Sequence, residues 1–171
     1  MFIVSRCLLG DNCKYNGENN ANKDVIEFCK THKYVAICPE SAADLDVPRE
    51  PVELRISETG EVRAIDRSGN DLTDDFNKGA YWSIQAALLE AGSRADGAFR
   101  IEGAILKDNS PSCGAGTVYD GTFTGNLTER NGIFTDKLIE AYQNDGQILG
   151  RLDFAENFKI CNEHNFKDVF K

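Results

Sequence analysis

The order of elements in the first 40 or so residues is the feature that most constrains the fold. The apolar run Phe2–Ser5 predicts a strand, and the Gly/Asp/Asn-rich segment 10–20 that follows suits only a loop. An apolar stripe at helical spacing predicts a helix over 22–32, and 34–38 predicts a second strand that ends at a proline. Strand, helix and strand in this order predict a βαβ unit, and therefore a parallel pair with a right-handed crossover.

The rest of the chain extends this pattern. Residues 51–56 and 61–65 alternate on either side of a Gly turn, which predicts a β-hairpin inserted beside the main sheet. The other expected elements are helices over 73–95 and 135–143, strands over 103–107 and 147–149, a loop over 108–125 and a short terminal helix in the tail. The prediction is an α/β fold, a three-layer Rossmann-like domain with a mainly parallel sheet and a small β-hairpin insertion. One domain is expected over 1–171, with a core over 2–150 and a C-terminal extension over 151–171.

The composition and net charge of the chain argue against two classes of partner, nucleic acids and membranes. The chain has 171 residues, of which 41% are hydrophobic, enough for a core without disulfides. With 19 basic and 28 acidic residues its net charge is −9, which argues against binding to nucleic acid. No segment approaches the ~20 apolar residues of a membrane span, and the first apolar run is too short for a signal peptide. We therefore expect a cytoplasmic protein whose partner is a small molecule, with no nucleic acid and no membrane; the oligomeric state is left open.

The cysteines say most about the kind of functional site that this chain can form. There are six of them and only two histidines, and neither histidine has a metal-ligand spacing with a cysteine. In a reducing compartment such cysteines favour metal binding or catalysis over disulfides. A metal held mainly by thiolates is zinc, Cu(I) or the iron of an iron–sulfur cluster.

Three of the cysteines are expected at one edge of the sheet. Cys7, Cys38 and Cys113 each follow a predicted strand, and ligands of parallel α/β sheets bind at the carboxyl ends of the strands. Three thiolates can hold a metal centre that keeps one position open. The alternative for Cys7 and Cys38 is that they are small core residues, the role expected for Cys29 and Cys161. The alternative for Cys113, in a polar glycine-rich loop, is an ordinary turn with an incidental thiol.

Polar residues beside these cysteines also have two interpretations each. Glu40, at a strand end, is placed to act as a general acid or base, or is a solvated surface charge. Ser110 donates a hydrogen bond to a substrate or caps a turn. Lys107 attracts an anion or forms an ion pair. The glycine-rich loop around Cys113 offers backbone N–H groups to an anion or a substrate.

Five segments resemble, in sequence order, the signatures of a known family. They read SRCLLGDNCKYNG from position 5, CPE from 38, REPVE from 49, LKDNSPSCG from 106 and VYDGTFTG from 118. These segments resemble the domain-of-unknown-function 523 (DUF523) family, which includes the thiouracil desulfidases. The resemblance spans about residues 2–150 and leaves the tail uncovered. Arg6 departs from it, because a small residue is usual before the first cysteine.

The resemblance implies a cofactor and a reaction. A 4Fe–4S cluster would be held by Cys7, Cys38 and Cys113, with one iron not ligated by protein. That iron would bind the thiocarbonyl sulfur of a small thiolated compound, most plausibly a thiopyrimidine, and water would replace the sulfur. 2-Thiouracil would thus give uracil and sulfide without net redox change. The resemblance makes Glu40 and Ser110 the catalytic residues, and the substrate-binding residues would be Lys107, Asn109 and Ser112.

Two alternatives to this reaction remain. The same three cysteines could hold zinc in a hydrolase with an open water position. The protein could instead be a non-catalytic carrier of sulfur or metal. A pure carrier would not need Glu40 and Ser110 beside the ligands.

Overall fold

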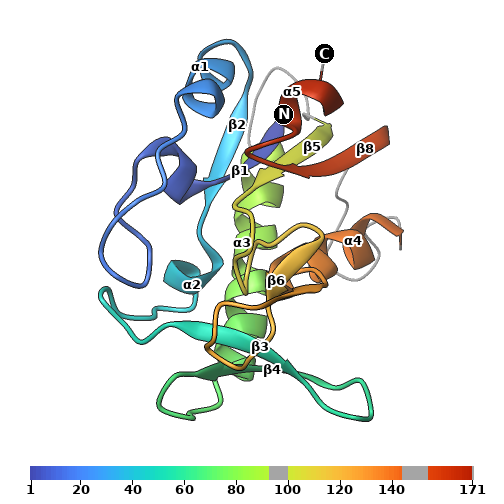
Figure 1. Cartoon of the computed structure of the whole chain (residues 1–171). Coiled ribbons are helices and arrows are strands. Elements are labelled where there is room, and N and C mark those ends of the chain that lie inside the picture. Colours follow the sequence, from blue (N-terminus) through green and yellow to red (C-terminus); the bar gives the residue numbers. More distant parts are fainter. Residues whose placement is uncertain (93–99, 144–153, 171) are drawn as a thin grey trace.

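The computed structural model describes residues 1–92, 100–143 and 154–170. Its elements in chain order are β1 (Phe2–Ser5), the 3-10 helix η1 (Arg6–Leu9), α1 (Lys23–Thr31), β2 (Tyr34–Ile37), α2 (Pro39–Ala42), β3 (Val52–Ile56), β4 (Val62–Asp66), α3 (Thr73–Gly92), β5 (Ile101–Leu106), β6 (Thr117–Tyr119), β7 (Leu127–Glu129), α4 (Ile133–Gln143), β8 (Phe154–Asn162) and α5 (Phe166–Val169) (Figure 1).

The central sheet has the strand order β2-β1-β5-β8, and every neighbouring pair in it is parallel. β1 and β2 are joined through α1, so the predicted βαβ unit is confirmed. Two small antiparallel hairpins, β3–β4 and β6–β7, stand beside this sheet. The α/β fold with a mainly parallel sheet and an inserted hairpin is therefore confirmed.

Residues of each central strand alternate between two apolar layers, because successive side chains of a strand point to opposite faces. In β1, Ile3 packs in the cluster that contains residues of α3 and α4, whereas Phe2 and Val4 pack in the cluster that contains residues of α1 and α5. β5 repeats this, with Ala104 and Ile105 on opposite faces. The sheet thus lies between two helical layers (Figure 1).

A glycine in α3 sets how closely this helix approaches the residues after β2. A Cβ on Gly79 would lie 2.0 Å from the carbonyl oxygen of Pro39, so only glycine permits the observed contact. Pro39 begins α2, and Cys38 and Glu40 lie on either side of it. The Gly79 contact therefore positions two of the predicted site residues.

The tail differs from its prediction. Instead of a terminal helix alone, it contains the nine-residue strand β8 followed by the single-turn helix α5. In β8, Phe158 and Ile160 pack on one face and Cys161 on the other, but the exposed charged residues Glu156 and Lys159 interrupt the apolar pattern of the strand. β8 is an edge strand, where charged residues are common. Cys161 is buried, as expected of a core cysteine, and Cys29 is half-buried.

The remaining predictions concern the loop over 108–125, two short segments and a membrane span. The hairpin β6–β7 begins within the segment expected to be a loop, because strands of three residues carry too little periodicity to be detected. The end of the first long predicted helix, 93–95, and the predicted strand 147–149 lie outside the described residues. Among the helices that the structure describes, none combines the length and the apolar character needed to cross a bilayer.

Candidate functional site

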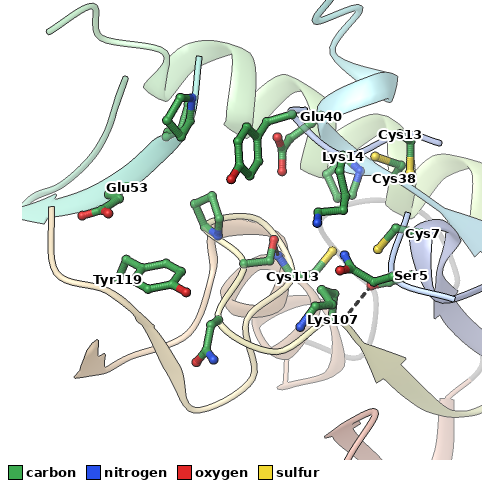
Figure 2. A pocket seen from close by; sticks show the side chains of 18 of the residues that line it. Ser5, Cys7, Cys13, Lys14, Cys38, Glu40, Glu53, Lys107, Cys113 and Tyr119 are labelled. Carbon is green, nitrogen blue, oxygen red and sulfur yellow. Dashed lines mark hydrogen bonds between the residues drawn. The ribbon is translucent and has the colours of Figure 1, made fainter. Parts of the chain in front are cut away.

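A cavity of about 510 Å³ lies where β1, β2 and β5 end. This is the edge at which open parallel α/β sheets bind their ligands. Its volume is in the range of small-molecule sites. Figure 2 shows the labelled cysteines on one side of the pocket, and Glu53 and Tyr119 on the other.

All three predicted ligand cysteines line this cavity. Cys7 lies in η1 directly after β1, Cys38 directly follows β2, and Cys113 lies in the loop after β5. The hydroxyl of Ser5, the last residue of β1, accepts a hydrogen bond from the backbone N–H of Lys107 at 3.0 Å. That bond joins the ends of β1 and β5, and so holds the Cys7 and Cys113 segments next to each other.

A fourth thiol, Cys13, lines the same part of the cavity and had no assigned role in the sequence analysis. It is buried, and the Cys38 and Cys7 thiols both affect its pKa. Cys38 lowers the pKa of Cys13, but Cys7 and burial outweigh this effect, so the pKa is raised. The only sequence signal for Cys13 is its place in the segment that begins at position 5.

Two other cavity thiols, Cys38 and Cys113, also have a raised pKa. The interaction of the Cys38 thiol with Cys13, together with burial, raises the pKa of Cys38 well above its usual value. Burial raises the pKa of Cys113 in the same way. Thiolates would therefore form here together with a bound cation, which displaces the thiol protons.

The donor set fits an iron–sulfur cluster. Over the described ranges 1–92, 100–143 and 154–170, no three His, Cys, Asp or Glu side chains are gathered tightly enough to hold one metal ion. Cysteine ligands of a cluster bind different irons and therefore stand farther apart than the ligands of a single ion. Soft sulfur donors lining one cavity are also the ligand type that iron–sulfur clusters require.

Glu40 is held at the cavity wall by a guanidinium and a hydroxyl. Its Oε2 accepts hydrogen bonds from Arg49 Nη2 at 2.6 Å and Nε at 3.0 Å, and its Oε1 accepts one from Ser112 Oγ at 2.9 Å. The Arg49 and Glu40 side chains are only 9% and 15% exposed. Arg49 Nη2 also donates to the carbonyl oxygen of Cys13 at 3.1 Å. The clamp therefore ties Glu40 to the loop that carries Cys13.

The Cys113 loop is pinned against the start of α4. Thr135 Oγ1 donates to the carbonyl oxygen of Cys113 at 2.9 Å, and the backbone N–H of Phe134 donates to that of Ser112 at 2.9 Å. A Cβ on Gly132 would lie 2.3 Å from the Ser112 carbonyl oxygen, so this close packing requires glycine. The loop is therefore rigid at the cysteine.

Ser110 lies in the cavity wall and caps the turn before Cys113. Its Oγ accepts hydrogen bonds from the backbone N–H groups of Ser112 at 3.2 Å and Cys113 at 3.1 Å. A hydroxyl accepts two hydrogen bonds and donates one. Within the described part of the chain no acceptor takes that remaining proton, so both roles foreseen for Ser110 are compatible with the geometry.

Lys107 and Asn109 also line the cavity, whereas Ser112 does not. Lys107 Nζ lies 2.5 Å from Glu163 Oε1, so this lysine is ion-paired with the tail. Asn109 has a positive φ of 56°, a conformation that asparagine tolerates, and its Oδ1 accepts from Thr117 Oγ1 at 2.7 Å. Ser112 is buried behind the wall, where its hydroxyl orients Glu40.

The wall opposite the cysteines is built from the hairpin insertion and the β6–β7 hairpin. Glu53 Oε2 accepts hydrogen bonds from the backbone N–H groups of Gly121 at 3.0 Å and Phe123 at 2.9 Å. The guanidinium of Arg67 lies 5.6 Å from the centre of the Phe123 ring. The inserted hairpin thus holds one wall of the cavity in place.

The fold and this cavity define an α/β protein with a thiol-lined site at the carboxyl edge of a parallel sheet. Residues 2–144 match the 2-thiouracil desulfurase family, and the chain belongs to that family. The resemblance to DUF523 proteins is thereby confirmed.

Two similar proteins extend this comparison. A Bacillus subtilis protein, YbbK, is 35% identical over 147 residues, which cover 82% of this chain and 91% of the relative. The solved structure of a [4Fe–4S]-dependent thiouracil desulfidase, TudS, superposes with a TM-score of 0.71 at 29% identity. That match covers 98% of this chain and 93% of TudS, so the likeness includes the tail that the sequence resemblance left uncovered.

Proposed function

We propose that this chain removes sulfur from a small thiolated compound, a thiopyrimidine such as 2-thiouracil, with a 4Fe–4S cluster as cofactor. One observation carries the proposal: in a member of the 2-thiouracil desulfurase family, three cysteines from three strand ends and a clamped carboxylate line one cavity. The neighbour TudS is itself a [4Fe–4S]-dependent thiouracil desulfidase, which supports the same cofactor here.

Cys7, Cys38 and Cys113 would hold the cluster. A cluster with one iron free of protein ligands supplies a Lewis acid that binds soft sulfur and polarises the C=S bond. The overall reaction breaks the C=S bond and forms a C=O bond with the oxygen of water. Both protons of that water leave with the sulfur as hydrogen sulfide, so no oxidant or reductant is consumed.

Glu40 would be the general base for that water. Oε1 accepts one hydrogen bond from Ser112 and retains a free lone pair, while Arg49 binds Oε2 and fixes the orientation of the carboxylate. Ser110 would donate its hydroxyl proton to a heteroatom of the substrate ring. Lys107 and Asn109, on the same wall, would contact the ring, and Ser112 would act through Glu40.

Cluster assembly is the first test. After anaerobic reconstitution we expect about four irons per wild-type chain. Cys7→Ser, Cys38→Ser and Cys113→Ser should each lose that iron, whereas Cys29→Ser, a half-buried cysteine outside the cavity, should keep it. Zinc in place of iron, or full iron in any of the three variants, would contradict the assignment of these ligands.

Turnover is the second test. The loaded wild type should release sulfide from 2-thiouracil without a partner protein. Glu40→Gln should keep its iron but lose about 100-fold or more in rate, in the range of general acid–base catalysis. Glu61→Gln is the matched control in the exposed turn of the β3–β4 hairpin, and it should leave the rate of sulfide release unchanged. A loaded wild type that releases no sulfide would overturn the proposed reaction.

A further inference from the structure

Five cations line the cavity, and most of them already have partners. Arg49 is paired with Glu40 and Lys107 with Glu163. Arg6 is paired with Asp11, and the guanidinium of Arg67 lies over the Phe123 ring. The fifth cation is Lys14. Within the residues that the structure describes, no carboxylate lies within ion-pairing distance of the Lys14 ammonium. Its charge is therefore available to a ligand.

The backbone at Lys14 is held on both sides. Its N–H donates to the carbonyl oxygen of Glu18 at 3.1 Å, and its carbonyl oxygen accepts from the N–H of Gly17 at 3.0 Å. The side chain is half-buried, and Figure 2 shows it pointing into the pocket on the side of the labelled cysteines. An unpaired ammonium in a partly buried pocket attracts a negatively charged or strongly polarised atom more strongly than one in open water.

We propose that Lys14 binds the substrate through a ring oxygen or nitrogen that carries negative charge, so that the site selects thio-heterocycles that are anionic or strongly polarised beside the thiocarbonyl. This inference rests on the proposed desulfuration. Addition of water to the C=S carbon pushes electron density onto the heteroatoms conjugated with it. A cation held at those atoms stabilises that charge while the C=S bond breaks and the C=O bond forms.

Steady-state kinetics of the cluster-loaded enzyme provide the first test. Loss of a charge-assisted hydrogen bond corresponds to about 10-fold to 100-fold in affinity, so Lys14→Met should raise the KM for 2-thiouracil by at least about 10-fold. Lys14→Arg should restore most of that loss. Lys78→Met removes the same charge from an exposed position of α3 outside the cavity and should leave KM unchanged. Added NaCl should raise KM for the wild type but not for Lys14→Met.

A binding measurement separates this inference from the proposed reaction. Barbiturate, a sulfur-free pyrimidine that is anionic at neutral pH, should bind the loaded wild type by calorimetry and bind Lys14→Met about 10-fold or more weakly. Equal binding by the two proteins, or no binding by the wild type, would overturn the role of Lys14. Loss of iron from Lys14→Met would also overturn it, because the lysine would then serve the cluster. If Lys14-dependent binding occurs without sulfide release, the reaction fails and the anion site stands.

Discussion

Replacement of Arg49 by methionine tests whether Arg49 stabilises the buried carboxylate of Glu40 at the cavity wall. Methionine keeps most of the side-chain volume but removes both hydrogen bonds to Glu40 Oε2 and the bond to the Cys13 carbonyl oxygen. Glu40 would then be a carboxylate that is only 15% exposed and has no counter-ion. Breaking one partner of a buried ion pair costs about 3–5 kcal/mol. Because the pair is not fully buried, we expect a loss near the lower end of this range, about 3 kcal/mol.

Urea unfolding of proteins with equal iron content, followed by circular dichroism, measures this loss. The double variant Arg49→Met with Glu40→Gln should lose less than the Arg49→Met single variant, because it leaves no buried charge. Measured together with the Glu40→Gln single variant, it completes a double-mutant cycle that gives the coupling energy of the pair. Arg63→Met is the matched control: Arg63 pairs with Glu61, and these side chains are 53% and 58% exposed. Its loss should stay below about 1 kcal/mol. If Arg49→Met is no more destabilising than Arg63→Met, the clamp does not hold Glu40 in the way described.

Two further predictions concern the supports of the site. Gly79→Ala brings a Cβ to 2.0 Å from the Pro39 carbonyl oxygen. It should therefore destabilise the protein by about 1–3 kcal/mol and lower the amount of iron bound after reconstitution. An unchanged free energy of unfolding and an unchanged iron content would show that α2 moves freely. Hydrogen bonds from Asn70 lower the pKa of Asp66 below 3.8, so the stabilisation that this carboxylate gives is complete above that pH and is lost as the pH falls through the lower folded-state value. Asp66→Asn should therefore be less stable than the wild type at pH 7 and approach it in acid, and a gap that is constant from pH 7 to pH 3 would contradict this.

Elements with a local signal were predictable from the sequence. The first strand, the helix that follows it and the inserted hairpin each show a clear periodicity bounded by a turn, and the structure has all three. β8 was not predicted, since charged residues at a sheet edge interrupt its apolar pattern. Its pairing with β5 also joins segments about 50 residues apart, which no local pattern reports.

For the site, sequence reasoning was strongest where strands end. Cys7, Cys38 and Cys113 could be placed at one edge because the direction of parallel strands determines where their ends lie. Cys13 could not, because it comes from an irregular loop whose path depends on tertiary contacts. The pairing of Arg49 with Glu40 could not be predicted either, because it depends on how the chain turns between the two residues. The hydrogen bond from the Ser112 hydroxyl to Glu40 was likewise not predicted, and contact of Ser112 with a substrate stays a prediction.

The ion pair between Lys107 and Glu163 joins the loop that follows β5 to the residues that follow β8. Glu163 Oε1 binds the Lys107 ammonium and its Oε2 accepts from the backbone N–H of Asp108 at 2.8 Å, so the tail supports the cavity wall from behind. A ribosome delivers the N-terminal residues first. Cys7, Cys38 and Cys113 therefore emerge from the ribosome well before Glu163, which supports the start of the loop that carries Cys113. A nascent chain therefore has its three predicted ligand thiols before β8 has joined the sheet.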